Sequence, residues 1–496
     1  MITSPSRFAL LLCLCGSASA LANIYTVTNT ANAGPGSLRA AMKAANAHPN
    51  ASVAKPDEIH FNIPGEGVQR IAPLTQLPAI VDPVVIDGYT QPGSSVNTKR
   101  NSDNAVLVIE LNGGQSDGEH GLILKARTTL SGLVINGFTG DGVHVASGAG
   151  HVIAGNFIGT DAAGLTGLAN GIGVSLEADA TVGGIDPASR NVISGNSVRG
   201  VLVLAGSAVI QGNFLGPTAK GNSAPENNTQ YGVRMIATGG LIGGAEPGAR
   251  NVISGNLGGG IDVETASPDP SAPPAVIVGN RIGTTAAGTK PLGNRFGIVI
   301  RSPAKVGLLE DGTSTLRIAN TIAYNHPFGG ILVAVNGVTM TRNRIYGNKL
   351  LGIDLEEDGV TMNDQGDLDD GPNGLQNFPL LSSASVDQGQ IAIAGSLNSK
   401  PNATYRIECF ASGKADKSGY GEGRWFLGAV NVTTDGAGNA AFNFSRRFRV
   451  IGARRATATA TDADGNTSEF SHAVQITRPP SAADAAGDGG QDADED

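Results

Sequence analysis

The chain has 496 residues, of which 71 are glycine and only 4% are aromatic, and its formal net charge is −9. This length exceeds one ordinary globular core, so we expect several domains or one elongated repeat domain with additions. The acidic balance argues against a nucleic-acid partner, because phosphate contacts need a concentrated basic surface.

Residues 1–22 have the pattern of a signal peptide. Arg7 supplies a positive start, residues 8–15 form an apolar run, and small residues within 18–22 offer a cleavage site. We therefore expect an exported protein, secreted or at the cell surface, with the periplasm as an alternative. No other stretch is long and apolar enough to span a membrane. Since only Cys409 remains after cleavage, no intramolecular disulfide is expected.

Residues 23–60 are predicted to form an N-terminal cap that contains a short amphipathic helix. Ser37 is a suitable N-cap residue for this helix, which extends to Asn46. Its apolar face comprises Leu38, Ala41, Met42 and Ala45. Such a helix can cover the exposed end of a stack of parallel strands, which would otherwise invite aggregation.

The next 316 residues, 61–376, contain a repeat. From residue 121 a glycine followed by Leu, Ile or Val opens a short alternating segment nine times, at Gly121, Gly142, Gly171, Gly200, Gly232, Gly260, Gly297, Gly330 and Gly352. The shortest spacings are 21 and 22 residues, which is the range of solenoid repeats. Period-two alternation and β-branched residues favour strands over helices. We predict an all-β fold, a right-handed parallel β-helix roughly 50 Å long at about 4.8 Å per rung.

Asparagines recur where the second segment of each rung ends. Those at the predicted corners are Asn156, Asn196, Asn213, Asn256, Asn280 and Asn343. Stacked side-chain amides can bond to one another and satisfy backbone groups in a turn. We therefore interpret these residues as a structural ladder rather than as ligand contacts.

The rung pattern ends near Leu375, and residues 377–477 contain about seven alternating segments separated by turn residues. That spacing predicts an Ig-like β-sandwich. Residues 478–496 are mostly Ala, Gly and Asp and lack the apolar content needed to fold, so we predict a disordered acidic tail.

Two segments near the N-terminus and the repeated rungs each resemble a known protein family. The segments YTVTNT at residues 25–30 and GPGSLRAA at 34–41 resemble the start of bacterial secreted β-helix proteins of the CSLREA-domain type. The rungs resemble the right-handed β-helix repeat proteins of the pectin-lyase-like superfamily. Enzymes of that superfamily usually act on acidic polysaccharides, by β-elimination with a basic residue and Ca²⁺ or by hydrolysis with paired carboxylates.

Period-two alternation sorts the outward-facing residues of successive rungs into rows. The first outward row is predicted to contain His144, Arg234, Asp262, Val299, Leu332 and Asp354. The second is predicted to contain Ser175, Ile236, Glu264, Arg301 and Glu356.

Asp262 and Glu264 are the best candidates for a catalytic pair. They lie two residues apart on one strand, roughly 7 Å by strand rise, within the range of inverting glycosidases. Arg234 precedes Asp262 by one rung, and Arg301 follows Glu264 by one rung, so cross-strand ion pairs explain all four residues, and we favour this interpretation over catalysis. We see neither the basic cluster typical of pectate lyases nor the Gly-His-Gly signature of polygalacturonases.

The loop that follows the last rung is acidic. Asp364, Asp367, Asp369 and Asn373 place oxygen atoms in the rhythm of a small Ca²⁺ loop, and Gly371 permits the turn. A structural Ca²⁺ ion and a solvated acidic linker remain alternative interpretations.

In the sandwich, Tyr420 and Trp425 flank a glycine-rich turn and could stack on a sugar ring, although such residues also serve as core. Taken together, the sequence favours a monomeric exported protein that binds polysaccharide or a cell-surface component without catalysis. The alternative is a polysaccharide lyase or glycoside hydrolase that acts in a groove on the β-helix.

Overall fold

A computed structural model describes residues 22–50, 54–225, 230–265, 272–307, 319–449 and 451–478. Residues 1–21 of the predicted signal peptide and residues 479–496 of the predicted acidic tail lie outside the described residues.

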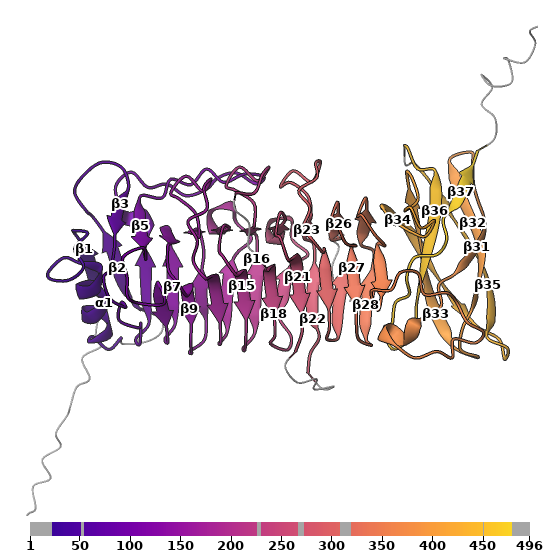
Figure 1. The fold of residues 1–496 in the computed structure, drawn as a ribbon, viewed down its shortest axis with the longest axis horizontal. Coiled ribbons are helices and arrows are strands. Elements are labelled where there is room, and N and C mark those ends of the chain that lie inside the picture. The colour runs from indigo at the N-terminus through magenta and orange to yellow at the C-terminus, as the bar shows by residue number, and fades with distance from the viewer. Residues whose placement is uncertain are drawn as a thin grey trace, which may run out of the picture.

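Three parallel sheets run along the length of the molecule, and from Val84 onward the chain visits them in turn, one strand per sheet in each coil (Figure 1). Within the described residues, the eleven-stranded sheet consists of β1 (Ile24–Val27), β2 (Asp57–Phe61), β4 (Val84–Asp87), β7 (Thr128–Ser131), β10 (His151–Ile153), β13 (Ala180–Gly183), β16 (Ala208–Gln211), β19 (Leu241–Gly243), β22 (Ala275–Val278), β25 (Ala304–Gly307) and β28 (Val338–Thr341).

The other two sheets complete each coil. In the part of the chain described, the ten-stranded sheet consists of β3 (Gln69–Ile71), β5 (Ile109–Asn112), β8 (Leu133–Asn136), β11 (Phe157–Ile158), β14 (Val192–Ile193), β17 (Phe214–Leu215), β20 (Val252–Ile253), β23 (Arg281–Ile282), β26 (Thr321–Ala323) and β29 (Arg344–Tyr346). The nine-stranded sheet, counted over the same residues, consists of β6 (Leu122–Leu124), β9 (Asp141–Val145), β12 (Ile172–Leu176), β15 (Arg199–Val203), β18 (Tyr231–Met235), β21 (Gly259–Val263), β24 (Ile298–Ile300), β27 (Ile331–Val333) and β30 (Ile353–Leu355). The predicted parallel β-helix is confirmed.

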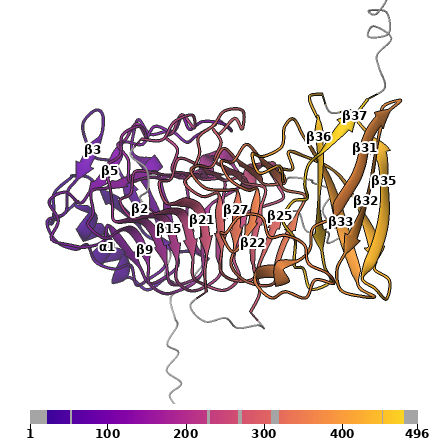
Figure 2. The same ribbon diagram turned by 45° about the vertical axis from the view of Figure 1, so that its right-hand side comes forward.

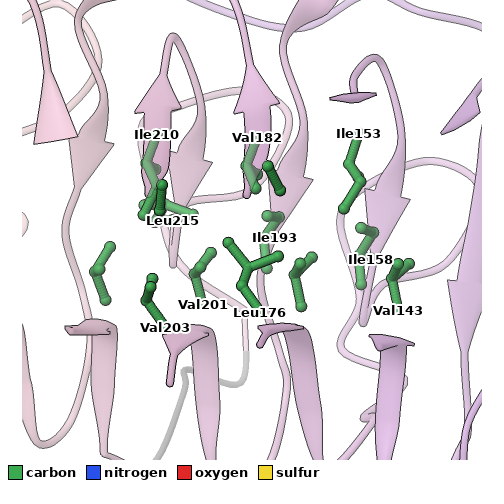
Figure 3. Close-up of a cluster of buried hydrophobic side chains, with 14 of the residues drawn as sticks. Val143, Ile153, Ile158, Leu176, Val182, Ile193, Val201, Val203, Ile210 and Leu215 are labelled. Carbon is green, nitrogen blue, oxygen red and sulfur yellow. The ribbon is translucent and has the colours of Figure 1, made fainter. Parts of the chain in front are cut away.

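Aliphatic side chains fill the interior of the coils in columns (Figure 3). One residue stacks on the equivalent residue of the next coil, as in the columns Ile153–Val182–Ile210 and Ile158–Ile193–Leu215. These six side chains are fully buried. β-Branched residues suit this arrangement because their restricted rotamers pack well on a pleated surface.

The predicted asparagine ladder is confirmed, and it is double. The first ladder joins Asn156, Asn191, Asn213, Asn251, Asn280, Asn320 and Asn343, each donating from its side chain to the next at 2.9–3.2 Å. The second includes Asn196, which accepts from Asn170, and a run from Asn256 through Asn294 and Asn325 to Asn348. All are buried, so each amide satisfies a neighbour that water does not reach.

An α-helix closes the N-terminal end (Figure 1). In α1 (Leu38–Asn46) the four predicted apolar residues are the buried ones, and the Ser37 hydroxyl accepts a hydrogen bond from the backbone N–H of Ala40, as expected of an N-cap. Strands β1 and β2 already pair in the eleven-stranded sheet, so residues 23–60 hold both the helix and the first strands of the coil. No helix in the described part of the chain is long and apolar enough to cross a membrane. The remaining helices described are the 3₁₀ turns η1 (Gly88–Thr90), η2 (Pro187–Ser189), η3 (Pro247–Ala249) and η4 (Pro372–Leu375).

Beyond the last coil lies the predicted β-sandwich (Figure 2). Its strands described here are β31 (Leu380–Asp387), β32 (Gln390–Asn398), β33 (Thr404–Ser412), β34 (Trp425–Thr433), β35 (Asn439–Arg447), β36 (Arg455–Thr461) and β37 (Val474–Thr477). One layer contains β31, β32, β35 and β37, the other contains β33, β34 and β36, and the β36–β37 pair joins them at one corner. Cys409 is buried in this core as a free thiol.

Three buried carboxylates of the sandwich meet the backbone of the last coils. Glu408 accepts from the N–H of Arg342, Glu469 accepts from the N–H groups of Leu355 and Thr361, and Glu422 accepts from the N–H groups of Gly347 and Asn348. Glu422 also accepts from the side chain of Asn348 and so terminates the second ladder. Burial raises the pKa of Glu422 to about 7 and that of Glu469 to about 8. The sandwich thus closes the C-terminal end of the β-helix with polar acceptors.

Candidate functional site

The outward face of the nine-stranded sheet carries most of the candidate residues. Strand register places one row of side chains along it: His144, Ser175, Leu202, Arg234, Asp262, Val299, Leu332 and Asp354. The prediction of Ser175 for the second row was wrong, because Val174 rather than Ile172 pairs with Val143. The rung therefore starts at Gly173, two residues later than the glycine chosen from the sequence.

Asp262 lies at the centre of an ion-pair cluster. Its carboxylate is fully buried and lies 2.5 Å from Nη1 of Arg301 and 3.4 Å from Nε of Arg234. Arg234 also pairs with Glu264 at 2.7 Å. The Arg234–Asp262 contact predicted from the register is present. The expected Glu264–Arg301 pair is not formed, because Glu264 pairs with Arg234 and Arg301 pairs with Asp262.

Burial dominates the electrostatics of this cluster. The pKa of Asp262 is raised by desolvation, although Arg301 and Arg234 act in the opposite direction. Burial also raises the pKa of Tyr231, with Asp262 as the next contributor, and lowers the pKa of Arg199. Three arginines thus surround two carboxylates, so this cluster carries a small surplus of positive charge, whereas the histidine end of the face also carries Asp141 and Glu177.

A second cluster on the same face was missed from the sequence. Nδ1 of His144 lies 2.9 Å from the carboxylate of Asp141 and 2.8 Å from the hydroxyl of Ser175, which itself donates to Asp141 at 2.8 Å. The ring of His120 stacks on that of His144 at 4.8 Å. The hydrogen bond to Asp141 is the main cause that raises the pKa of His144.

This histidine cluster offers two kinds of chemistry. Asp141 holds Nδ1 of His144, while Nε2 lies 3.9 Å from Glu177, an arrangement suited to proton transfer. The ligand atoms of His120, Asp141 and His144 also lie within 4.8 Å of one another, close enough to share a metal ion. The sequence did not group these residues, because Asp141 lies just before the rung glycine and Ser175 was assigned to the wrong row. The correct strand register would have placed both beside His144.

The structure brings three of the four predicted Ca²⁺ ligands together. Oxygen atoms of Asp364, Asp367 and Asp369 lie within 4.8 Å of one another. Asp367 accepts hydrogen bonds from the N–H of Asn377 and the hydroxyl of Ser399, while one oxygen of Asp369 is buried without a hydrogen-bond partner. Burial, followed by the charges of Asp364 and Asp367, raises the pKa of Asp369.

Asn373, the fourth predicted ligand, has a different role. Its side chain accepts from the N–H of Val338 and donates to the carbonyls of Val338 and Thr467. It therefore ties the loop to both β28 and the sandwich.

Tyr420 and Trp425 are both partly exposed, and both also pack within the sandwich. Tyr420 makes edge-on contacts with Phe378 and His472 at 5.4 and 5.3 Å. Trp425 packs against the sandwich core, and the guanidinium of Arg424 lies 4.7 Å from its ring centre. Each residue has a structural role in addition to its exposed surface.

A scan against family models and a search of curated proteins find no match to this chain. The fold itself, a parallel β-helix solenoid followed by a sandwich, is established by the strand pairing. Function therefore has to be argued from the geometry of the outward face.

Proposed function

We propose that this is an exported protein of the pectin-lyase-like β-helix type that binds polysaccharide along the outward face of its nine-stranded sheet. The observation that carries this proposal is the pair of polar clusters on that face. His144 and Arg234 lie in the same row three strands apart, on β9 and β18, roughly 14 Å by strand spacing. A glycan of a few sugar residues laid across the strands would contact both clusters, and the surplus of positive charge in the arginine cluster suits an acidic group on that glycan.

Binding without cleavage is favoured by the state of Asp262. Two arginines engage its carboxylate, and Arg234 joins it to Glu264, so neither predicted catalytic carboxylate is free to act on a water molecule. Removing one member of this buried network would leave its partner as an unpaired buried charge, which is destabilising. We therefore infer that the network holds the shape of the face.

Cleavage is the second candidate, and the His144–Asp141 pair favours it. A carboxylate that orients one imidazole nitrogen leaves the other to exchange protons with a substrate. A lyase would use such a base to remove the proton next to a uronate carboxylate.

Calorimetric titration with polygalacturonate oligomers and neutral glucans tests both candidates. We expect the polyuronate to bind, and Arg301→Gln to weaken binding about tenfold, because the partly exposed guanidinium supplies a charge-assisted hydrogen bond. Lys305→Gln, on the neighbouring eleven-stranded sheet, is the matched control and should bind like the wild type. Binding that Arg301→Gln leaves unchanged would contradict the proposal.

The same incubations distinguish binding from cleavage. Unsaturated or reducing ends that appear with the wild type and are lost in His144→Ala would replace the binding-only view with catalysis. No new ends over a long incubation, with binding retained, would support it.

We also propose a structural Ca²⁺ ion at Asp364, Asp367 and Asp369. The convergence of three carboxylates and the unpartnered buried oxygen of Asp369 support it, since hard oxygen ligands suit Ca²⁺. The ion would neutralise like charges that otherwise repel.

A further inference from the structure

Three arginines line a small pocket at the ten-stranded sheet. Arg281 is the first residue of β23 and Arg344 is the first residue of β29, and Thr321 of β26 lies between them in register. Arg250 lies two residues before the start of β20. The pocket has a volume of about 180 Å³, and Gly288 and Tyr346 complete its wall. Successive coils therefore direct three guanidinium groups toward one cavity.

The charge of this pocket is uncompensated within the described residues. Over the part of the chain that the structure describes, no carboxylate lines it and none of the three arginines forms an ion pair. Burial, with Arg250 and Arg344 as the next causes, lowers the pKa of Arg281 to about 10. Burial and Arg344 lower the pKa of Arg250 as well. Like charges held this close destabilise the fold unless a ligand neutralises them.

Backbone contacts hold two of the guanidinium groups in place. Arg250 donates from Nε to the carbonyl of Gly279 at 3.0 Å, and Arg281 donates to the carbonyl of Ala286. Gly288 has a φ of +73°, and a Cβ there would lie 2.7 Å from Nε of Arg281. Only glycine lets the loop backbone approach so closely, so the loop fixes Arg281 at the edge of the cavity that both residues line.

Arg190 shows what a purely structural arginine looks like at the same place in the repeat. Like Arg250 it precedes a ladder asparagine, and the two segments 182–191 and 242–251 match in sequence. Arg190, however, donates to four backbone carbonyls, of Lys99, Arg100, Ser102 and Gly212, and lies over the ring of Phe214. Arg250 has one such bond, so most of its donors remain for another partner.

We propose that the pocket of Arg250, Arg281 and Arg344 binds an oxyanion, a phosphate or sulfate group, carried free or as an ester on a glycan. Planar guanidinium groups bind such oxygens in pairs, and several arginines can share one anion. An adjoining pocket of about 310 Å³ shares Arg250 and Arg281, which gives room for a sugar attached to the anion. This site lies on a different sheet from the polysaccharide face and does not depend on the function proposed for that face.

The test is calorimetric titration of the full-length protein with inorganic phosphate, inorganic sulfate, a sulfated oligosaccharide and its unsulfated counterpart. We expect saturable binding of at least one anion, weakened tenfold or more in the Arg281→Gln/Arg344→Gln double variant. Lys305→Gln removes an exposed charge outside the pocket and should bind like the wild type. A sulfated oligosaccharide that binds more tightly than inorganic sulfate, with the gain lost in the double variant, would identify an ester, and equal affinities would identify the free ion.

A melting experiment without anion separates a ligand site from a packing role. Removing two of three repelling charges should leave the melting temperature of the double variant equal to or above that of the wild type. A double variant that melts lower than wild type and control would show that the arginines support the fold, and would overturn the proposal. So would a wild-type protein that binds no anion, or a double variant that binds normally. Arg301→Gln should not change the binding of inorganic phosphate or sulfate, which keeps this outcome distinct from that of the polysaccharide test.

Discussion

At its N-terminal end the β-helix is covered by the apolar face of α1, whereas at its C-terminal end it is met by carboxylates that reach across from the sandwich. Both ends have the same problem, since the last coil exposes an apolar interior and backbone groups without a neighbouring strand. The N-terminal cap, built from residues close in sequence, buries aliphatic side chains. The C-terminal cap, built from residues 66 to 114 positions away, supplies hydrogen-bond acceptors in addition to the apolar rings of Phe410 and Phe470.

The two ends of the β-helix should therefore respond to different perturbations. Apolar burial in α1 involves no ionisation, so its contribution to stability should not depend on pH. Glu422 and Glu469 have pKa values raised to about 7 and about 8, so the C-terminal end should depend on pH in the neutral range. The following predictions test this contrast.

The largest effect is expected at the N-terminal end. Met42→Ala should lower the free energy of unfolding by about 2–5 kcal/mol, because the side chain is fully buried and its loss leaves a cavity. The decrease, measured by denaturant unfolding, should be the same at pH 5 and pH 8. Lys43→Ala, exposed on the same helix, is the control and should change stability little. A decrease in the free energy of unfolding that varies strongly with pH would contradict the expected difference between the two ends.

At the C-terminal end the sign of the pH effect follows from Glu469. Its pKa in the folded protein, about 8, is above the ordinary value of 4.5, because burial and the charges of Asp354 and Asp358 disfavour the carboxylate. The folded state therefore holds a proton that the unfolded state has released. This stabilisation is complete below about pH 4.5 and is lost as the pH rises through 8.

The variant Glu469→Gln isolates this contribution. Between pH 5 and 8 Glu469 alone should lower the stability of the wild type by on the order of 3 kcal/mol, and Glu469→Gln should remove that part of the slope while the part from Glu422 remains. Glu66→Gln, which removes an exposed carboxylate, should keep the wild-type slope. Calorimetric melting across this range provides the measurement, and a wild-type stability that rises with pH would contradict the assignment.

The same contrast explains what the sequence could and could not predict. The apolar face of α1 was readable because its residues recur at helical spacing, and the coils were readable because glycine and alternation mark each rung. The partners of Glu408, Glu422 and Glu469 were not readable, because they depend on how the sandwich docks.

The histidine cluster was lost for a more local reason. Gly171 and Gly173 are both followed by residues that fit a strand start, and choosing the first moved Ser175 out of the row of His144. His120 and Asp141 directly precede the rung glycines Gly121 and Gly142, whereas the predicted rows contain only residues that follow each glycine. A pattern read along one chain cannot resolve a two-residue ambiguity that strand pairing resolves at once.

The smallest expected effect concerns the acidic loop, which lies beside the C-terminal junction through Asn373 and Ser399. If Ca²⁺ binds there, its addition at ten times its Kd should stabilise the folded protein by about 1.4 kcal/mol, and EDTA should remove that gain. Asp369→Asn should reverse the comparison. With Ca²⁺ it should be less stable than the wild type because a ligand is weakened, and with EDTA it should be equally or more stable because repulsion with Asp364 and Asp367 is relieved. Asp370→Asn, at an exposed neighbour, should follow the wild type in both conditions. Identical melting curves with Ca²⁺ and with EDTA would mean that the three carboxylates form a solvated cluster and not a metal site. The C-terminal end would then be closed by protein groups alone.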